Sequence, residues 1–329
     1  MNTEADRLAS AQFRDALGRE DLAAIRKAPK ADLHTHSFLG GRLSRYREWA
    51  ACELPDPPAV FADFSDFDDY ILNDLAVPYG DGGADRIRDF FRFFYAETLR
   101  EAIADGVVAI EPSLDWSTVM LYDGDPVAMA EDYARVIEET LAEAGNPSIE
   151  VRPELGMARS TPMELLQRYI PALLSTGFFR SLDLYGDERI GGIEEYAPFW
   201  RLAGELGMRK KAHSGELCGA AHVRESVTVL DLDAVQHGIA AACDPELMEF
   251  LAKRGTVLNV CPTSNVRLGR AESIVGHPVR RLHDAGVTVT INSDDLMVFD
   301  SSVSEEFLKL KQAGLFTADE LDRIRLNAL

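Results

Sequence analysis

The sequence predicts a single (β/α)8 barrel of the α/β class, in which eight parallel strands form a closed ring surrounded by helices. Short apolar runs alternate with longer amphipathic stretches along the chain, and several of those stretches end at glycine, as helices commonly do. A strand followed by a helix, repeated about eight times, is typical of a closed parallel barrel rather than an open sheet. A single domain over residues 1–329 is compatible with this fold, because barrels commonly reach about 250 residues or more as one unit.

Eight apolar segments are predicted as the strands of this barrel. In chain order they cover residues 30–36, 106–114, 151–158, 179–186, 209–216, 232–238, 255–265 and 287–295. Between most of them, apolar residues recur at helical spacing, most clearly over residues 125–145, 162–177 and 244–255. The chain contains no internal sequence repeat, low-complexity tract or interdomain linker, so we expect one folded unit.

The segment between the first two predicted strands departs from this regular spacing. Residues 37–105 are far longer than a usual connection, so we expect them to form a helical insertion. The segment is rich in aromatic residues, as in RDFFRFFY, and contains the stiff run LPDPP. Two interpretations remain open, namely a lid over the mouth of the barrel and a helical pair packed on its outside.

Composition and charge exclude several classes of partner. The 55 acidic residues outnumber the 34 basic residues, and the net charge of -21 would repel nucleic-acid polymers and anionic membranes. The four cysteines are scattered without a CxxC pair, which fits a reducing compartment. The N-terminal residues lack the pattern of a signal peptide, and no apolar run reaches the roughly 18 residues of a membrane span. We therefore expect a cytoplasmic protein.

Histidines and aspartates stand at the C-terminal ends of four predicted strands. They are His34 and His36 at the first strand, His213 at the fifth, His237 at the sixth, and Asp294 and Asp295 at the eighth. An isolated HxH pair is more often packed or exposed than bound to a metal, but a barrel brings these strand ends to one face. His34 and His36 would also point to the same side of their strand. The set therefore predicts a metal site.

Several of these segments resemble the adenosine deaminase family of the amidohydrolase superfamily. The matching pieces, in the order found in that family, are PKADLHTH, SLDLYGDE, KAHSGE, QHG, CPTSNVRLG, HPVRRLHDAGV and INSDD. The resemblance implies a (β/α)8 barrel with one Zn²⁺ ion per chain, held by His34, His36, His213 and Asp294. It further implies Glu216 as the proton donor, His237 as the assistant of the attacking water, Asp295 as a hydrogen-bond partner of the purine, and the backbone of Gly186 as a contact of the purine's far edge.

The chemistry of these residue types is consistent with the implied roles. Three neutral imidazoles and one carboxylate suit zinc and leave room for a water molecule whose pKa falls toward about 7. Attack on an aromatic C–N carbon also requires protonation of a ring nitrogen, which an acid such as Glu216 could provide. A solvated loop position remains open for Glu216, and a fifth ligand position or a packed position remains open for His237.

The neighbouring residues Asp294 and Asp295 raise a geometric question. Adjacent residues in a regular strand face opposite sides, so we expect one carboxylate to bind the metal and the other to reach elsewhere. The run SLDLYG offers no lysine that could bridge two metals, so a single ion is the simpler interpretation.

The chain departs from the family pattern directly after the paired histidines. Ser37, Phe38 and Leu39 stand where most members carry leucine, an acidic residue and glycine. We therefore expect a pocket that lacks the charged acceptor used near the sugar and that has the ring of Phe38 near its mouth.

The activity implied is hydrolytic deamination of a small-molecule aminopurine, most simply adenosine to inosine plus ammonia. Two alternatives remain open: a hydrolase of the same fold acting on another amine or amide, and a catalytically silent relative that binds purines. The sequence does not predict the oligomeric state.

Overall fold

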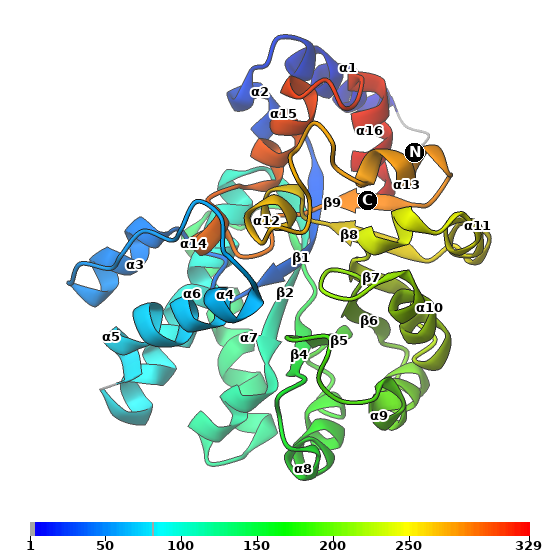
Figure 1. Cartoon of the computed structure of the whole chain (residues 1–329). Helices are drawn as coiled ribbons and strands as arrows, with labels where there is room; N and C mark the ends of the chain where they lie inside the picture. The colour runs from blue at the N-terminus through cyan, green and yellow to red at the C-terminus, as the bar shows by residue number, and fades with distance from the viewer. Residues whose placement is uncertain (1–3, 81) are drawn as a thin grey trace.

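The centre of the protein is a ring of parallel strands (Figure 1), described by a computed structural model for residues 4–80 and 82–329. The strands follow the order β1-β2-β4-β5-β6-β7-β8-β9. They are β1 (Lys30–His36), β2 (Val107–Asp115), β4 (Glu154–Ala158), β5 (Ser181–Tyr185), β6 (Arg209–Ser214), β7 (Ala234–His237), β8 (Val257–Val260) and β9 (Val289–Ile291). Each predicted strand segment contains or closely overlaps one of these strands, so the predicted (β/α)8 barrel is confirmed. The short β3 (Glu150–Val151) pairs with β2 in addition.

The ring closes between its last and first strands. Thr35 and Asp294 form an isolated parallel bridge, and the N–H of Asp294 donates to the carbonyl of His34 at 2.9 Å. The side chain of Asn292 accepts a hydrogen bond from the N–H of Leu33 at 2.8 Å. This closure brings the C-terminal end of β1, which carries two histidines, beside the chain that leaves β9.

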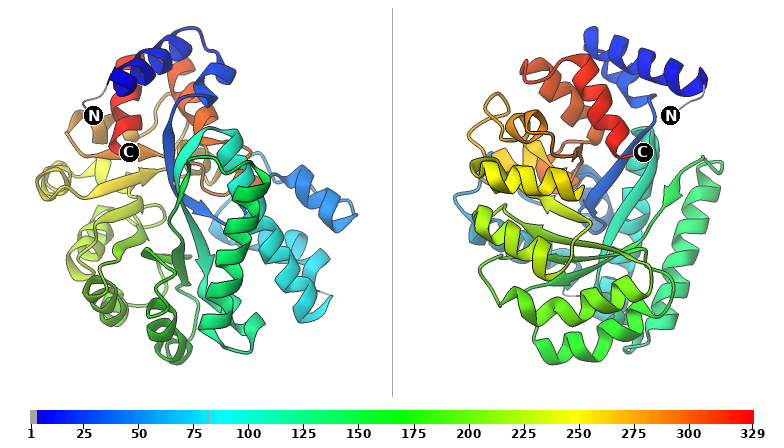
Figure 2. Two further views of the ribbon diagram at one scale, coloured as in Figure 1. Left: turned by 180° about the vertical axis from the view of Figure 1, so that it is seen from behind. Right: turned by 90° about the vertical axis from the view of Figure 1, so that its right-hand side faces the viewer.

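Helices surround the ring on its outside (Figure 2). The barrel helices after β2 are α7 (Pro126–Glu143), α8 (Met163–Leu174), α9 (Ile193–Glu205), α10 (Ala220–Val229), α11 (Pro245–Arg254), α13 (Val279–Asp284), α15 (Val303–Gln312) and α16 (Ala318–Asn327). Shorter segments at the strand ends are η2 (Trp116–Tyr122), η3 (Ile239–Cys243), α12 (Pro262–Arg267) and α14 (Leu296–Phe299). At the N-terminus, α1 (Glu4–Gly18) packs on α16, and α2 (Leu22–Arg26) packs on α15.

The local sequence explains where these helices begin and end. Asp125 and Asp244 cap the N-termini of α7 and α11 by accepting backbone N–H groups, and a proline follows each of them. Helix α11 ends at Gly255, whose φ of +76° is the left-handed conformation that glycine adopts without strain. The helices predicted over residues 125–145, 162–177 and 244–255 are α7, α8 and α11.

The interior of the barrel is polar below the strand ends. Lys211 is fully buried and lies 2.6 Å from Glu111 Oε2, and it also forms an ion pair with Glu154. Gln236 donates to Glu154 at 3.4 Å and accepts from Asn259 at 2.8 Å. Buried charges are tolerated only when they are paired or hydrogen-bonded, and this network satisfies that condition.

The segment between β1 and β2 has two parts. Helix α6 (Gly83–Ala104) packs against β2 and α7, and Tyr95, Leu99 and Ala102 in its second half join the main core. The preceding elements are α3 (Leu43–Ala50), α4 (Phe64–Asp69), the π-helix η1 (Tyr70–Leu75) and α5 (Val77–Gly80). Residues of α3, α4 and η1 form a separate aromatic cluster with Phe90 and Phe94 of the first half of α6, and this cluster includes Leu268 and Phe299 from the C-terminal end of the barrel. None of the described helices is long and apolar enough to cross a membrane.

Candidate metal centre and active site

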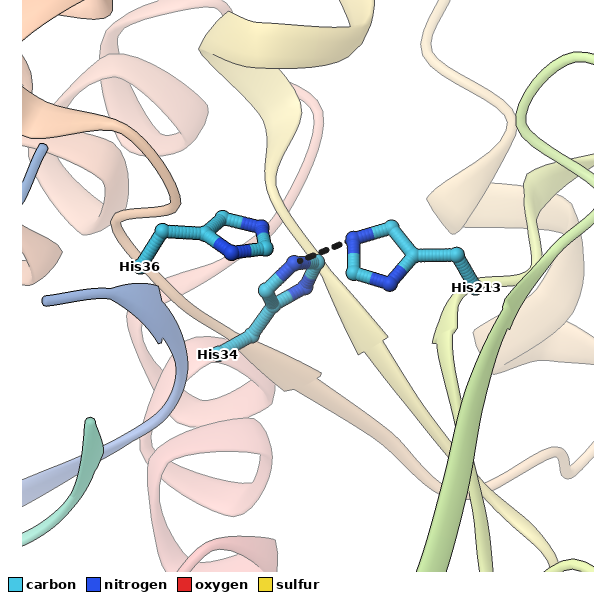
Figure 3. A group of neighbouring side chains, drawn as sticks. All are labelled: His34, His36 and His213. Carbon is cyan, nitrogen blue, oxygen red and sulfur yellow. Dashed lines mark hydrogen bonds between the residues drawn. The ribbon is translucent and has the colours of Figure 1, made fainter. Parts of the chain in front are cut away.

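Three histidines meet at the C-terminal end of the barrel (Figure 3). His34 and His36 come from β1 and His213 comes from β6, and all three are buried. One ring nitrogen from each of them lies within 4.8 Å of the others. The closest pair, His34 Nε2 and His213 Nε2, is separated by 3.1 Å. The two strands that carry these histidines lie far apart in the sequence and meet only because the barrel closes.

The carboxylate of Asp294 completes a set of four donors. Its Oδ1 lies 3.5 Å from His34 Nε2 and 3.6 Å from His36 Nε2. A tetrahedral zinc ion with bonds of about 2.0–2.1 Å holds its ligand atoms about 3.4 Å apart. The three separations given above lie close to that value, so the spacing of these residues is consistent with one bound metal ion.

Burial keeps two of the histidines neutral. Burial and the neighbouring histidine rings hold the pKa of His34 well below its ordinary value, and burial followed by the effect of His213 lowers the pKa of His36 to about 3. A neutral imidazole offers a lone pair to a metal. Burial also disfavours the charged ring of His213, but the combined attraction of Asp183, Glu216 and Asp294 raises its pKa to about 9. Metal binding at His213 therefore has to displace a proton.

Asp183 is a residue of this centre that sequence reasoning missed. It is fully buried on β5, and its Oδ2 lies 3.0 Å from His213 Nδ1, the nitrogen that faces away from His34. Such a carboxylate orients a metal-binding imidazole and raises its basicity. A signal was available in the run SLDLYG, because a charged residue between two leucines of a buried strand needs a partner from elsewhere in the fold.

Glu216 and His237 lie beside the four donors. Glu216 Oε1 is 3.5 Å from His237 Nε2, which is 3.8 Å from Asp294 Oδ2. Burial and the charge of Asp294 raise the pKa of Glu216 to about 8, so its acid form prevails at neutral pH in the metal-free protein. The other nitrogen of His237, Nδ1, lies 3.1 Å from the side-chain nitrogen of Asn265.

Asp294 and Asp295 both reach the same cavity, which differs from the expectation for a regular strand. Strand β9 ends at Ile291, and Asp294 has a φ of +60°, so the chain has already turned out of the strand at these residues. Left-handed backbone is uncommon outside glycine and tends to gather at functional sites. Burial and the charge of Asp294 raise the pKa of Asp295 well above its ordinary value. Asp295 Oδ1 has no hydrogen-bond partner among the described residues and is free to bond a ligand.

The donors open into a cavity of about 270 Å³, near the lower end of the roughly 300–1,000 Å³ typical of small-molecule sites. Its lining includes His36, His213, Glu216, His237, Asp294 and Asp295. Gly186, with a φ of +94°, and Phe38 are also in the lining, as are Tyr185, Ala158 and Ser160. The sequence therefore singled out many of the polar groups that face this cavity.

The helical segment after β1 forms part of the cavity wall. Phe64, Phe67, Ile71 and Leu72 line the cavity from α4 and η1. Two carboxylates, Asp68 and Asp187, line it as well, whereas the lining formed by the described residues includes no lysine or arginine. Arg189 lies close by, but Asp187 holds its guanidinium with two bonds of 2.8 Å.

A (β/α)8 barrel with a buried three-histidine, one-aspartate cluster at its C-terminal face belongs to the class of metal-dependent hydrolases. The family model described as adenosine deaminase matches residues 60–329. The chain belongs to the adenosine deaminase family, and the resemblance seen in its sequence is confirmed. The match begins after His34 and His36, whose place in the centre comes from the geometry of β1.

A full-length relative and two solved structures are similar to this chain. A protein of Treponema pallidum (strain Nichols), whose name proposes an adenosine/adenine deaminase, is 32% identical over 298 residues, which are 91% of this chain and 96% of that protein. The crystal structure of adenine deaminase from Arthrobacter aurescens has a TM-score of 0.76 at 22% identity and covers 91% of this chain and 92% of its own. An amidohydrolase from Burkholderia ambifaria with bound Zn has a TM-score of 0.73 at 20% identity and covers 94% of this chain and 86% of its own.

These likenesses establish the class of the enzyme. At such identities the two solved structures show a shared fold, and the family match adds the reaction class. The protein is a metal-dependent hydrolytic deaminase of the adenosine deaminase family.

Proposed function

We propose that this protein hydrolyses the exocyclic amine of an unphosphorylated aminopurine, adenosine or adenine, and releases ammonia. With adenosine the product is inosine. The single observation that carries this proposal is the cavity lining. It combines three of the four metal donors and the acid Glu216 with two further carboxylates, Asp68 and Asp187, and includes no described lysine or arginine. The name of the Treponema pallidum relative, adenosine/adenine deaminase, supports the same pair of substrates.

The proposed cofactor is one zinc ion per chain, held by His34, His36, His213 and Asp294. The spacing of the donor atoms and the neutral state of His34 and His36 support this assignment. The amidohydrolase from Burkholderia ambifaria, a neighbour in fold, carries bound Zn. When bound, zinc supplies a Lewis acid that lowers the pKa of a water molecule toward about 7.

The surrounding side chains have the properties that the reaction requires. Water adds its oxygen to the amine-bearing carbon, a ring nitrogen takes a proton, and the amine leaves as ammonia. Glu216 is proposed to donate the proton to the ring nitrogen, because its raised pKa keeps it protonated near neutral pH. His237 Nε2 faces both Glu216 and Asp294, where it can orient the water.

Two further groups are proposed to orient the purine. The unpartnered Oδ1 of Asp295 would bond a nitrogen of the purine, and its protonated carboxyl could donate as well as accept. The backbone of Gly186 would meet the far edge of the ring. Positioning of this kind accounts for a large share of the rate gain in enzymes, because it replaces the entropy cost of bringing the reactants together.

The lining argues against nucleotides as substrates. A phosphate monoester carries close to two negative charges near pH 7 and is usually bound by arginine or lysine. Here Asp68 and Asp187 stand near the mouth, and the guanidinium of Arg189 is already held by Asp187. Placing an unpaired anion beside carboxylates should cost about 3 kcal/mol or more, equivalent to about 100-fold in affinity.

The same lining bears on the sugar. Two positions after His36, Phe38 stands in place of an acid, and its ring lies 5.8 Å from the ring of Phe91. The pocket was expected to lack a charged acceptor near the sugar, but the carboxylate of Asp68 on α4 lines the cavity. We therefore expect any contact to a sugar hydroxyl to come from the helical segment. Removing the 5′-hydroxyl of adenosine should lower the activity of the wild type more than that of Asp68→Ala, because the variant has already lost the contact to that hydroxyl.

The experiment is a substrate panel with zinc-loaded protein, measuring ammonia release from adenine, adenosine, deoxyadenosine, AMP and N6-methyl-AMP. We expect turnover of an unphosphorylated purine. The kcat/KM for AMP should be lower than the kcat/KM for that purine by about 100-fold or more. The variant Asp68→Asn should narrow that gap, and Phe38→Leu serves as a control that leaves the charge unchanged. AMP turned over as well as adenosine would refute the assignment. Failure of zinc-loaded protein to release ammonia from any purine would favour a different amine substrate or a silent purine-binding relative.

A further inference from the structure

A buried carboxylate, Glu188, accepts hydrogen bonds from the backbone of the loop that carries the proposed proton donor, Glu216. Glu188 lies between β5 and α9, two residues after Gly186, and is 3% exposed. Its Oε1 accepts the N–H groups of Glu216 at 2.8 Å and Leu217 at 2.9 Å. Its Oε2 accepts the N–H groups of Gly215 at 2.8 Å and Cys218 at 3.2 Å. One side chain thus bonds every backbone N–H from residue 215 to residue 218.

The loop is shaped so that these N–H groups converge on an anion. Gly215, directly after β6, has a φ of +77°, and a side chain at this position would collide with Val223. Successive N–H groups in such a turn form a concavity that binds anions. A carboxylate from the neighbouring loop occupies it, with charge-assisted bonds that are about twice as strong as neutral ones.

Further contacts hold Glu188 in its ionised form. His222 Nδ1 lies 3.3 Å from Glu188 Oε2 and 2.8 Å from the hydroxyl of Ser214. Burial raises the pKa of Glu188, but the hydrogen bonds from His222 and the backbone outweigh burial and lower it. The acceptor therefore keeps its charge at neutral pH and can hold all of its donors.

We propose that Glu188 is a positioning residue that locks the loop of Gly186 to the loop of Glu216, and so sets the distance between the purine's far-edge contact and its proton donor. This inference rests on the proposed function, because it assigns those two contacts. Glu188 does not line the cavity, and it bonds the loop through the backbone N–H groups of residues 215–218. Its charge also adds to the effects of burial and Asp294 that raise the pKa of Glu216.

The consequence for catalysis follows from geometry. A proton donor works within hydrogen-bond reach of its acceptor, and a displacement of about 1 Å can reduce the rate about 100-fold. If the two loops separate, the Glu216 carboxyl no longer meets a purine that is held at Gly186. The loss should appear mainly in kcat, since the metal donors and the purine contact at Asp295 stay in place.

The test uses the full-length, zinc-loaded protein with the variant Glu188→Gln. Glutamine has nearly the same shape as glutamate but only one acceptor oxygen. Its NH₂ group cannot accept hydrogen bonds, so some of the backbone N–H groups of the loop would lose their partner. We expect kcat to fall about 100-fold, KM to change less than about tenfold, and zinc content to stay at the wild-type level. The amide hydrogens of residues 215–218 should exchange with solvent faster than in the wild type.

Two further variants make the result specific. Glu188→Asp keeps the charge but is too short to reach all four N–H groups, so it should give the same direction of change and substitutes if the glutamine variant does not fold. Glu97→Gln is the matched control, because Glu97 is an equally buried carboxylate on α6 that binds Arg45 and Arg100 away from the cavity. We expect this control to keep its kcat and the amide exchange of residues 215–218.

The outcomes separate this inference from the proposed function. Unprotected amides at residues 215–218 in the wild type, or unchanged exchange in both Glu188 variants, would overturn the coupling of the loops. Faster exchange with an unchanged kcat would show that Glu188 is structural only and would also overturn the proposal. If the wild type turned over no purine, the proposed function would fail, while amide exchange would still measure the coupling.

Discussion

The contact between Asp183 and His213 gives the sharpest prediction about the metal centre. The change is Asp183→Asn, which keeps the shape of the side chain and one acceptor oxygen but removes the charge. The original carboxylate is fully buried and lies 3.0 Å from His213 Nδ1. Because the asparagine oxygen can still accept from the imidazole N–H, the ring should keep its orientation while it loses basicity.

The size of the effect follows from the contact that is weakened. A hydrogen bond to a charged group contributes about 1.5–3 kcal/mol, and about 1.4 kcal/mol corresponds to tenfold in binding. The dissociation constant for zinc should therefore rise about 10- to 100-fold, the range expected when an outer partner of a metal ligand is removed. In the metal-free protein, the pKa of His213 should fall from about 9, because the charge of Asp183 makes the largest contribution that raises it against burial.

The assay is a competition between the protein and a coloured zinc chelator at constant pH, with the His213 titration of the metal-free protein followed by NMR. Asp132→Asn is the matched control, since Asp132 is a buried carboxylate on α7 that binds Arg92 and Tyr122. An unchanged zinc affinity in Asp183→Asn, with the control also unchanged, would refute the reasoning. It would mean that the barrel alone orients the imidazole.

Three other predictions concern the centre and its surroundings. Zinc-replete protein should bind about one zinc per chain, and His213→Ala should lose both metal and activity, as metal analysis and turnover would reveal. Glu216→Gln should keep its zinc while activity falls by about two to four orders of magnitude, and normal turnover would exclude Glu216 as the proton donor. Burial raises the pKa of Asp32 to about 7, although hydrogen bonds from Ser293 lower it. The folded protein therefore keeps this proton more tightly than the unfolded chain does, which stabilises the fold fully below about pH 4 and progressively less as the pH rises toward 7. Urea unfolding of the metal-free protein should therefore show a decline of up to about 4 kcal/mol across that window in the wild type and a smaller decline in Asp32→Asn.

Local patterns in the sequence were sufficient to predict the barrel and most of the centre. Alternating apolar residues mark the strands, helical spacing marks the helices, and Asp125, Asp244 and Gly255 mark helix ends. Because all parallel strands of a barrel end at the same face, His34, His213 and Asp294 could be expected to meet without any coordinates. These inferences succeed because each depends on neighbours within a few residues or on a general rule of the fold.

The tertiary structure decided the contacts that join distant segments. His34 and His213 are 179 positions apart, and no local pattern specifies that their nitrogens lie 3.1 Å from each other. The left-handed backbone of Asp294 depends on the closure of β9 against β1 and places two adjacent carboxylates in one cavity. Asp183, which contacts His213, and Glu188, which accepts backbone N–H groups of the Glu216 loop, likewise lie far in the sequence from the residues they support.

The sequence by itself therefore determined the fold class and placed histidines and acids at strand ends that share one face, because those depend on residue type and strand position. The roles proposed for the individual residues came from the resemblance to the adenosine deaminase family. Only the tertiary structure decided which groups support these residues and which side chains of the helical segment line the cavity. It also decided that Asp68 and Asp187 line the cavity, whereas no described lysine or arginine does. The physical reason is that hydrogen bonds, burial and charge act between atoms a few ångströms apart in space, and chain closure sets those distances.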